Sequence, residues 1–220
     1  SKVFSKNLMK KYEIPTAGYE VFDNSADAIS YIEKNNKYPI VIKADGLALG
    51  KGVIIAEDFD EAKAAVNTIM EDKIFGSSGL NVVIEEYLIG PEVSVLCFTD
   101  GKTISPMVTS MDHKRANDND EGLNTGGMGT VAPNPYYTQE ISDICMEKIF
   151  IPTIEAMNSE NRKFKGCLYF GLMLTEEGPK VIEYNCRFGD PETQVVLPLL
   201  DTDLLTVFEA VIDEKLEDID

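Results

Sequence analysis

Glu183, Asn185 and Arg187 occupy alternate positions in residues 181–192, a stretch that begins with strand-forming residues and ends as a loop. On an extended backbone alternate side chains point to the same face, so a carboxylate, an amide and a guanidinium would lie in one row. Carboxylate and amide oxygens suit Mg²⁺, which usually shares its coordination shell with substrate phosphates. A guanidinium two residues later can hold a phosphoryl group through its planar fork. The row therefore indicates a metal and phosphate site or, alternatively, the solvated polar face of an antiparallel strand.

A second stretch with chemical potential is rich in glycine, with Gly46, Gly50 and Gly52 following or flanking Lys43 and Lys51. Glycines let backbone amides approach an anion closely, and the two lysines add positive charge. The stretch differs from a Walker A loop, because its spacing is too short and glycine replaces the Ser or Thr that would bind magnesium. The flanking residues also predict strand, loop and strand rather than strand, loop and helix. The stretch is either a phosphate-binding loop or a flexible hairpin that binds no ligand.

Two further stretches carry weaker signals. Residues 83–88 form an apolar strand that ends in acids, and Glu92 follows shortly after. The backbone of such a strand could pair with the edge of adenine, with Glu92 on the ribose hydroxyls, or the strand could simply reach the surface. Residues 112–115 read Asp-His-Lys-Arg, and residues 124–129 read Asn-Thr-Gly-Gly-Met-Gly. A basic cluster before a glycine-rich loop suits a phosphorylated or carboxylated ligand, although a polar surface loop is the alternative interpretation.

The whole chain has 220 residues, of which 44% are hydrophobic and 26% are charged, and it is long enough for one large or two small domains. Its formal net charge of −18 argues against nucleic acid or an anionic membrane as a partner. None of the four cysteines forms a Cys-x-x-Cys pair and His113 is the only histidine, so zinc-finger, thioredoxin-like and histidine-rich sites are not expected. No apolar run is long enough to span a membrane, and no signal peptide is visible. We therefore expect a cytoplasmic globular protein with reduced cysteines.

Hydrophobic periodicity predicts the elements that must position these residues. Strands are expected at residues 19–22, 40–43, 53–56, 81–88, 92–98, 103–109, 168–174 and 180–185. Helices are expected at residues 1–13, from Ser25, at residues 58–70 and 140–157, and from about Asp203. Ser25 and Asp58 are expected N-caps, and Pro152 is expected to kink or split its helix, whereas residues 111–135 read as a long loop. Strands come mainly as hairpins, which favours an α+β fold with antiparallel sheets.

Taken together, these stretches resemble the ATP-grasp enzymes and, more narrowly, the phosphoribosylamine–glycine ligases of purine synthesis. The resemblance covers essentially all 220 residues. The glycine-rich stretch and the Glu-x-Asn-x-Arg row are shared in outline with many ATP-grasp enzymes, whereas the Asp-His-Lys-Arg and Asn-Thr-Gly-Gly-Met-Gly loops are more specific. The resemblance implies two α+β lobes with antiparallel sheets that clasp ATP between them. Residues 1–16 would form a connecting helix, residues 17–86 the smaller lobe, and residues 87–220 the larger lobe.

The resemblance also implies a reaction. ATP, glycine and 5-phosphoribosylamine would give glycinamide ribonucleotide, ADP and phosphate through a glycyl phosphate intermediate, with Mg²⁺ or Mn²⁺ as the metal. Family members carry an N-terminal Rossmann-like domain and a C-terminal domain beside this portion. Flanking domains of the same polypeptide are therefore expected to be missing, and this piece alone is expected to be weakly active or inactive.

Site residues that the resemblance carries over fall into four groups. Lys43 and Arg187 would act in catalysis, and Glu183 and Asn185 would hold the metal. The residues that would bind ATP are Lys2, Lys43, Gly46, Gly50, Lys51, Gly52, Glu85, Leu88 and Glu92, with Glu85 and Leu88 offering backbone groups. The residues that would bind glycine or phosphoribosylamine are Asp112, Lys114, Arg115, Asn124, Thr125, Gly126, Gly127, Met128, Gly129, Arg187 and Asp190. Residues 169–172 contain no acid, although many ATP-grasp enzymes carry another acidic metal ligand on this neighbouring strand.

Two other functions remain open. The chain could be another ATP-grasp carboxylate–amine ligase or a biotin-carboxylase-like enzyme, and the two more specific loops argue against that reading. It could also be a nucleotide-binding module without turnover. Release of ADP over a panel of substrates would distinguish the first alternative, and tight ATP binding without phosphate release would support the second.

Overall fold

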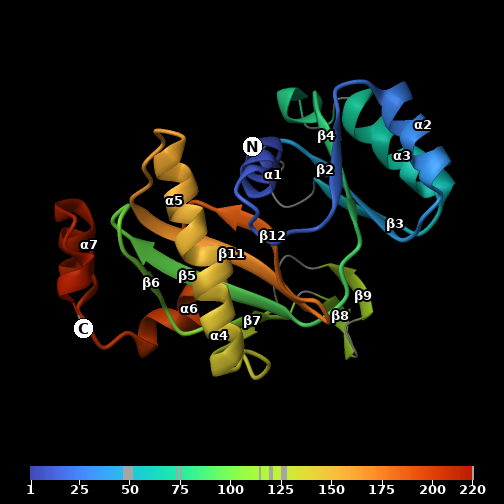
Figure 1. Ribbon diagram of the computed structural model, residues 1–220. Coiled ribbons are helices and arrows are strands. Elements are labelled where there is room, and N and C mark those ends of the chain that lie inside the picture. The colour runs from blue at the N-terminus through green and yellow to red at the C-terminus, as the bar shows by residue number, and fades with distance from the viewer. Residues whose placement is uncertain are drawn as a thin grey trace. The chain divides into compact units, whose positions relative to one another are not determined.

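A computed structural model describes residues 1–46, 52–72, 74, 76–113, 115–118, 121–124 and 128–219, with only the backbone described for residues 77, 115 and 121–124. The chain forms two compact units. The first unit comprises Ser1–Lys10 and Thr16–Leu88, and the second comprises Lys11–Pro15 and Ile89–Asp220. Each unit combines helices with antiparallel strands (Figure 1), in agreement with the predicted α+β class.

The first unit is built on a four-stranded antiparallel sheet in the order β1-β4-β2-β3. Its strands are β1 (Tyr19–Phe22), β2 (Ile40–Ala44), β3 (Val53–Ala56) and β4 (Val82–Glu86). The predicted ranges of the first three are confirmed to within a residue, whereas β4 is shorter than predicted. Strands β2 and β3 pair from Ile40↔Ala56 to Lys43↔Val53, so the glycine-rich stretch joins two adjacent strands, as predicted.

Two helices, α2 (Ser25–Asn35) and α3 (Phe59–Met70), lie side by side on one face of this sheet (Figure 1). Their apolar faces and the strands share one core. Its buried members include Ala28, Ile32, Ile42, Ala62, Val66, Ile69, Val82 and Ile84. The unit also contains α1 (Lys2–Lys11) up to Lys10, and the 3₁₀ turn η1 (Gly76–Gly79), which precedes β4.

The two helix starts test the predicted caps. The Asp58 carboxylate accepts a hydrogen bond from the Glu61 N–H, so Asp58 is the N-cap of α3, as predicted. The prediction for α2 is wrong by one residue. Its N-cap is Asn24, whose side chain accepts from the Asp27 N–H, and Ser25 is the first helical residue.

The second unit is built on another four-stranded antiparallel sheet, in the order β12-β11-β5-β6. Its strands are β5 (Glu92–Thr99), β6 (Ile104–Pro106), β11 (Gly166–Thr175) and β12 (Gly178–Asn185). Both predicted hairpins, β5 with β6 and β11 with β12, are confirmed. The β5–β6 turn uses Gly101 at a φ of 87°, a left-handed conformation that favours glycine.

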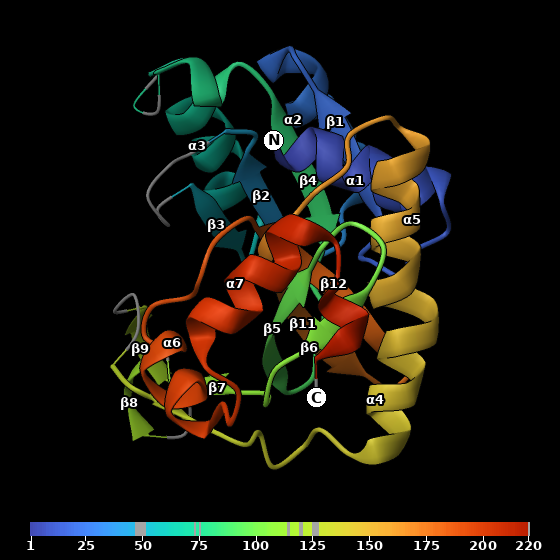
Figure 2. The same cartoon turned by 90° about the vertical axis from the view of Figure 1, so that its left-hand side faces the viewer.

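Helices cover both faces of this second sheet (Figure 2). On one face, the Phe150 ring contacts the Phe170 ring with centroids 4.6 Å apart. On the other, Leu96 and Tyr169 form a core with Val196 of α6 (Thr193–Val196). The helices of the unit are α4 (Gln139–Cys145), the π-helical segment η3 (Met146–Phe150), α5 (Ile151–Ser159), α6, the 3₁₀ turn η4 (Leu197–Leu199), α7 (Leu204–Asp213) and the 3₁₀ turn η5 (Leu216–Asp218).

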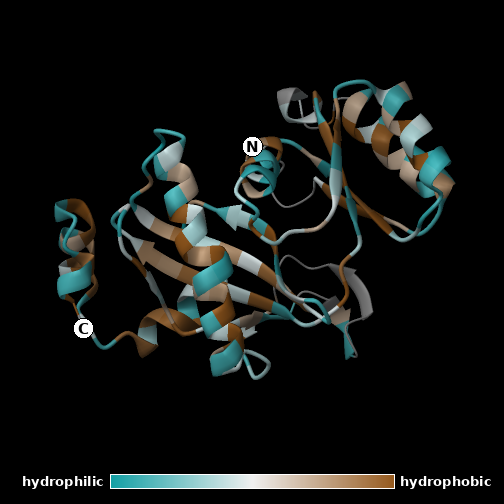
Figure 3. Ribbon diagram, in the orientation of Figure 1, coloured by the Kyte–Doolittle hydropathy of each residue, from teal (hydrophilic) through white to brown (hydrophobic). Residues whose placement is uncertain are grey.

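The helices mix apolar and polar residues, whereas β5 and β11 are largely hydrophobic (Figure 3). This is the pattern expected of amphipathic helices packed on a sheet that is covered on both faces. No helix in the described part of the chain combines the length and the apolar character needed to cross a membrane.

The helix predicted for residues 140–157 is split, as Pro152 suggested. The π-helical segment η3 separates α4 from α5, and Pro152 is the second residue of α5. Proline has no N–H to donate to the preceding turn, and the wide turn lies directly before it.

Residues 111–131 contain short strands that the prediction of a long loop missed. Strand β7 (Met111–Asp112) pairs with β10 (Thr130–Val131), and β8 (Arg115–Asn117) pairs with β9 (Glu121–Asn124). Strands of two to four residues are too short to show an alternating hydrophobic pattern, so the sequence carries no periodic signal for them.

Candidate functional site

In the first unit, Lys2 joins the start of α1 to the base of the glycine-rich stretch. Its ammonium donates to the Ala44 carbonyl at 2.9 Å and to the Gly46 carbonyl at 3.2 Å. The Ala44 N–H donates to the Gly52 carbonyl at 2.8 Å, which closes the base of the loop. A Cβ at Gly46 would overlap the Ser78 side chain, so this position requires glycine. Lys2, Gly46 and Gly52, all predicted to bind ATP, are therefore neighbours.

Asp45 fixes this arrangement to the helix. Its carboxylate accepts hydrogen bonds from the Val3 N–H at 2.8 Å and from the Ser1 hydroxyl at 2.7 Å. Burial raises the pKa of Asp45, but these hydrogen bonds outweigh burial and hold the pKa below its ordinary value. Asp45 therefore stays negatively charged at the N-terminus of α1, where its charge interacts favourably with the helix dipole and stabilises the helix.

A buried cluster of three charges lies beside this loop, formed by Lys6, Lys43 and Glu85. The Lys43 ammonium is 2.9 Å from Oε2 of Glu85, and the Lys6 ammonium is 3.1 Å from the same oxygen. The side chain of Lys43 is 6% exposed, that of Lys6 is 3% exposed, and that of Glu85 is 4% exposed. Oε1 of Glu85 is buried and has no hydrogen-bond partner among the described residues, so the cluster contains an acceptor that the described side chains and backbone leave unused.

Lys6 is the residue of this cluster that sequence reasoning missed. Its ammonium also donates to the Thr16 hydroxyl at 2.7 Å and to the Ala17 carbonyl at 3.4 Å. Burial lowers the pKa of Lys6 to about 8; the negative charge of Glu85 opposes this shift and the positive charge of Lys43 adds to it. The available signal was that Lys2 and Lys6 are four residues apart, and thus on one face of a helix.

The strand predicted to contact adenine carries Glu85 in its interior and ends before Leu88. Glu85 pairs with Tyr19 of β1 and with Val41 of β2, and Leu88 is half-buried. Glu92 begins β5 of the second unit, where its carbonyl accepts a hydrogen bond from the Asn134 side chain at 3.0 Å. Contacts of these residues with adenine and ribose stay predictions.

In the second unit, the alternating row at the end of β12 is present as predicted for its first two members. The Asn185 amide donates to Oε1 of Glu183 at 2.9 Å, and both side chains are half-buried. Across the sheet, Glu183 faces Gly171, and a Cβ there would press on the Glu183 side chain at 3.2 Å. Glycine at this position therefore leaves room for the carboxylate, and no acid stands opposite it.

A buried polar group lies on the same face of the sheet, formed by Ser94, Tyr169 and Glu192. The Ser94 and Tyr169 hydroxyls are 2.8 Å apart, and the Tyr169 hydroxyl donates to Oε1 of Glu192 at 3.1 Å. Burial raises the pKa of Tyr169, and the charges of Glu192 and Glu183 raise it further, so its hydroxyl stays protonated as a donor. A Cβ at Gly189 would overlap the Glu192 carboxylate, so this group also fixes the loop after β12. Sequence reasoning assigned no role to these three residues.

Arg187 and Asp190 lie in that loop and are exposed. The Arg187 guanidinium donates to the Phe188 carbonyl at 2.7 Å, and the Asp190 carboxylate accepts from the Gln194 amide at 2.7 Å. The third member of the predicted row therefore stands at the surface, where its guanidinium is bonded to the neighbouring backbone. Its role toward a phosphoryl group stays a prediction.

The predicted substrate loops begin at a pair of short strands. Asp112 faces Thr130 across β7 and β10, the His113 N–H donates to the Gly129 carbonyl at 2.8 Å, and the Met128 N–H donates to the His113 carbonyl at 2.9 Å. Met128 is 60% exposed, and Gly129 has open space around it. Arg115 faces Asn124 across β8 and β9. The structure therefore brings the beginning and the end of these loops together.

Several predicted site residues lie outside the described residues or are described only by their backbone. Gly50, Lys51, Lys114, Thr125, Gly126 and Gly127 lie outside, and Arg115 and Asn124 are described only by their backbone. Among the described residues, no group of three or more His, Cys, Asp or Glu side chains could hold a metal ion. The Glu183 carboxylate and the Asn185 amide lie on neighbouring side chains, and their oxygens are of the type that suits Mg²⁺, which typically takes one or two protein ligands and completes its shell with phosphates and water.

Comparison with protein families gives a match over most of the chain. A profile of the family described as phosphoribosylglycinamide synthetase, ATP-grasp (A) domain, matches residues 1–193.

Similar sequences come from bacteria and from a vertebrate. A phosphoribosylamine–glycine ligase of Caldanaerobacter subterraneus subsp. tengcongensis is 50% identical over 219 residues, covering 100% of this chain and 52% of that protein. The trifunctional purine biosynthetic protein adenosine-3 of Gallus gallus is 51% identical over 216 residues, covering 98% of this chain and 22% of that protein. The chain spans about half the length of the bacterial ligases it matches.

A solved structure is similar over nearly the same range. The crystal structure of phosphoribosylamine–glycine ligase from Thermotoga maritima superimposes with a TM-score of 0.88 at 36% identity, covering 97% of this chain and 54% of that one. With the family match, this confirms the predicted ATP-grasp fold.

Proposed function

Because the chain belongs to the phosphoribosylglycinamide synthetase family, as its ATP-grasp (A) domain, we propose that it binds Mg²⁺·ATP and activates a carboxylate by phosphorylation. The proposed reaction joins glycine to 5-phosphoribosylamine, as the names of its relatives indicate. Since the chain spans about half of those relatives, flanking domains of a longer polypeptide would contribute to the complete reaction.

The proposed reaction has two steps. A carboxylate oxygen of glycine attacks the γ-phosphorus of ATP, which forms glycyl phosphate and releases ADP. The amine of phosphoribosylamine then attacks the acyl carbon, phosphate leaves, and the amine loses a proton to give the amide. Such chemistry depends mainly on positioning and on neutralising phosphate charge.

The second unit would supply the metal side of this chemistry. Glu183 and Asn185 would hold Mg²⁺, which neutralises charge on the ATP phosphates when bound. Arg187 would steady the transferring phosphoryl group. Asp112, Met128 and Gly129, with the loops they flank, would contact the glycine and phosphoribosylamine substrates.

The first unit would supply the phosphate-binding cations and the adenine strand. Lys2 and Lys43 would contact phosphates, and the backbone from Gly46 to Gly52 would cover them. Glu85 and Leu88 would offer backbone groups to adenine, and Glu92 of the second unit would accept ribose hydroxyls.

The observation that carries the proposal is the Glu183–Asn185 pair. Two oxygen-bearing side chains lie side by side on one strand face, and a glycine opposite leaves them room. A solvated strand face would not need Gly171. Polar side chains that move freely in water could shift to make room for a larger residue at that position.

The test is a calorimetric titration of the chain with ATP, in the presence and absence of Mg²⁺. Glu183→Gln keeps the shape of the side chain and removes its charge, so we expect the affinity for Mg²⁺·ATP to fall and the magnesium dependence to disappear. In a polypeptide that includes the flanking domains, we expect turnover to fall roughly 100-fold, by analogy with the loss of one electrostatic stabiliser of a transition state.

Glu177→Gln is the matched control, because Glu177 is an exposed carboxylate in the β11–β12 turn, where it pairs with Lys180. It should leave ATP affinity and turnover unchanged. Failure of the unmodified chain to bind ATP would reject the proposed function. Tight binding without phosphate release by the longer polypeptide, given glycine and phosphoribosylamine, would favour a nucleotide-binding module without turnover.

A further inference from the structure

The buried cluster of the first unit contains two ammonium groups and one carboxylate. Lys6 and Lys43 approach the same oxygen, Oε2 of Glu85, at 3.1 and 2.9 Å. One carboxylate can neutralise only one of the two, so the cluster carries a surplus positive charge. Burial weakens screening by water, and a surplus buried charge therefore favours an anionic ligand more strongly than an exposed lysine does.

A contribution to folding stability does not explain why position 6 is a lysine. Its side chain is 3% exposed, and burial lowers its pKa from 10.5 to about 8. A cation whose pKa is lower in the folded state destabilises that state while it is charged, so this contribution of Lys6 opposes folding at neutral pH. An apolar side chain of similar length would fill the same space and leave Glu85 paired one-to-one with Lys43.

We propose that Lys6 is a positioning residue for nucleotide binding, which offsets the negative charge of Glu85 so that the charge of Lys43 remains available to the phosphates of ATP. This inference rests on the proposed function, because it needs an anionic nucleotide beside Lys43.

The surroundings of Lys6 hold its ammonium at the required place. The Thr16 hydroxyl and the Ala17 carbonyl accept from it at 2.7 and 3.4 Å, and the Tyr19 ring centroid lies 5.5 Å from it. These contacts direct the ammonium at Glu85 independently of Lys43. Without Lys6, the charge of Glu85 would act on Lys43 alone, and the pair would neutralise itself before any phosphate arrived.

The protonation of Lys6 gives the proposal a pH signature. Among the described residues, the charged and titratable groups that act on the ammonium are Glu85 and Glu86 of β4, Lys43 of β2, and Tyr19 of β1. Below pH 8 Lys6 is charged and opposes Glu85, whereas above pH 8 it loses its proton and no longer does so. ATP affinity should therefore fall as the pH rises through about 8.

The experiment is a calorimetric ATP titration, at saturating Mg²⁺ and at several pH values, of the unmodified chain, Lys6→Met and Lys6→Arg. We expect Lys6→Met to raise the Kd for ATP about tenfold at neutral pH, the scale for losing one close charge. Its Kd should no longer depend on pH near 8. Lys6→Arg should bind within a few-fold of the unmodified chain and should also lose this pH dependence, since arginine stays charged.

Lys10→Met is the matched control. Lys10 lies on the same helix, is exposed, and places its ammonium 5.6 Å from the same Tyr19 ring, so the variant removes one positive charge near the same ring but outside the cluster. It should bind ATP as the unmodified chain does, with the same pH profile. Thermal unfolding of each variant identifies any that fails to fold, and Lys6→Arg then still tests the pH profile.

The outcomes separate the two proposals. ATP binding by the unmodified chain, with equal affinity and equal pH profile in folded Lys6→Met, would overturn the role of Lys6 and leave the proposed function intact. No ATP binding by the unmodified chain would reject the proposed function itself. Weaker binding by both Lys6→Met and Lys6→Arg, with the pH profile of the unmodified chain retained, would show a merely structural role and would also overturn the inference.

Discussion

Glu85 in the first unit and Glu214 in the second are each shared by more than one lysine, but the two clusters differ in burial. Around Glu85, the two lysine side chains are 3% and 6% exposed. Lys6 is held there by hydrogen bonds from its ammonium to Thr16 and Ala17 as well as by Glu85. Water therefore has little access to this cluster.

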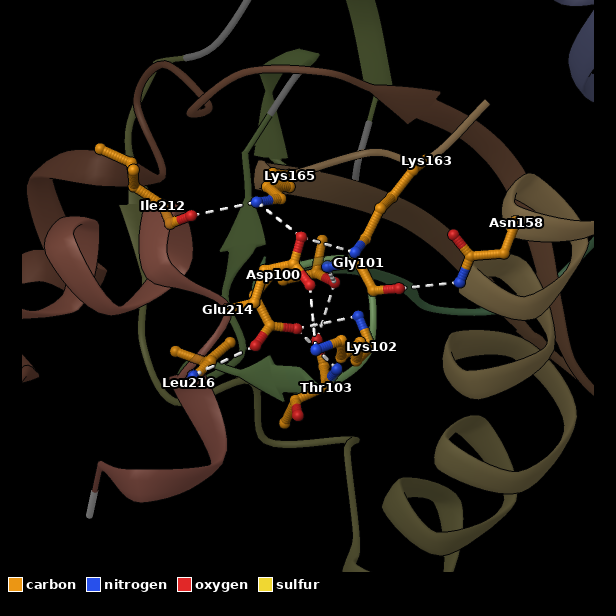
Figure 4. A network of polar contacts seen from close by, with 11 residues as sticks. Asp100, Gly101, Lys102, Thr103, Asn158, Lys163, Lys165, Ile212, Glu214 and Leu216 are labelled. Atoms are coloured by element: carbon orange, nitrogen blue, oxygen red, sulfur yellow. Dashed lines mark hydrogen bonds and ion pairs between the residues drawn. The ribbon is translucent and has the colours of Figure 1, made fainter. Parts of the chain in front are cut away.

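Around Glu214, three lysines converge on one carboxylate at the surface (Figure 4). Lys102, Lys163 and Lys165 lie 3.0, 2.7 and 2.9 Å from its oxygens. The lysine side chains are 64%, 38% and 34% exposed, and that of Glu214 is 28% exposed. The cluster holds the end of α7 to the β5–β6 turn and to the chain just before β11.

The comparison shows that the number of ion pairs does not measure their effect. The Glu214 cluster has more lysines, but water and salt screen it, and flexible side chains lose entropy in forming it. The Glu85 cluster has fewer contacts, but each charge in it has lost its hydration and depends on its partners. We therefore expect the buried cluster to govern stability and ligand binding, and the exposed one to have a small structural effect.

The largest expected effect separates the two carboxylates directly. Glu85→Gln removes the negative charge that two buried ammonium groups share, and it should destabilise the first unit by about 3–5 kcal/mol, the range for breaking a buried ion pair. Glu214→Gln should shift the urea midpoint only slightly. Urea unfolding followed by circular dichroism measures both variants. A larger shift for Glu214→Gln than for Glu85→Gln would contradict the comparison.

A smaller effect tests whether the lysines of the buried cluster act together. In the background of Glu85→Gln, Lys6→Met removes one of the two buried cations that no longer face the Glu85 carboxylate, so the double variant should be more stable than Glu85→Gln alone. The expected coupling is about 1–2 kcal/mol, within the range for contacting residues in a double-mutant cycle. Strict additivity of the two changes would show that Lys6 and Glu85 do not share a charge network.

The sequence predicts the Glu183–Asn185 pair but does not predict that Lys6 joins the buried cluster. Alternation alone places Glu183 beside Asn185, because a strand's period is local and the two residues are near neighbours. The turn at Asp100 and Gly101 likewise predicts the β5–β6 hairpin. The same locality fails for Lys6, which lies 79 positions before Glu85 (85 − 6), so only the folded chain brings them together.

Burial along α1 shows the same limit. The spacing of Phe4, Leu8 and Tyr12 indicates an apolar face, but the structure buries Lys6, Leu8 and Met9. A lysine is normally assigned to solvent, and only its contact with Glu85 of β4 reveals that this one is paired. The Ser94, Tyr169 and Glu192 group is missed for the same reason, since its members come from distant strands and a loop.

The smallest expected effect concerns Glu214 and its dependence on salt and acid. Its pKa is held below the ordinary value by hydrogen bonds from Lys163, Lys165 and Lys102, so its contribution to stability is present above the ordinary pKa of 4.5. That contribution is lost as the pH falls through the lower folded pKa. The difference in urea midpoint between the unmodified chain and Glu214→Gln should therefore be measurable at neutral pH and low salt, and should shrink in acid.

High salt should remove the same difference, because exposed charges are screened within about 3 Å at 1 M ionic strength. The difference in urea midpoint is already small at low salt, because Asp100 also binds the chain that follows α7 and does so without help from Glu214. The Asp100 carboxylate, 1% exposed, accepts from the Lys102, Thr103 and Leu216 N–H groups at 2.8, 2.7 and 3.1 Å (Figure 4). Glu85→Gln should keep its full effect at high salt, because its partners are buried. A salt-resistant effect of Glu214→Gln would show that the exposed cluster behaves like the buried one, and the distinction drawn from burial would fail.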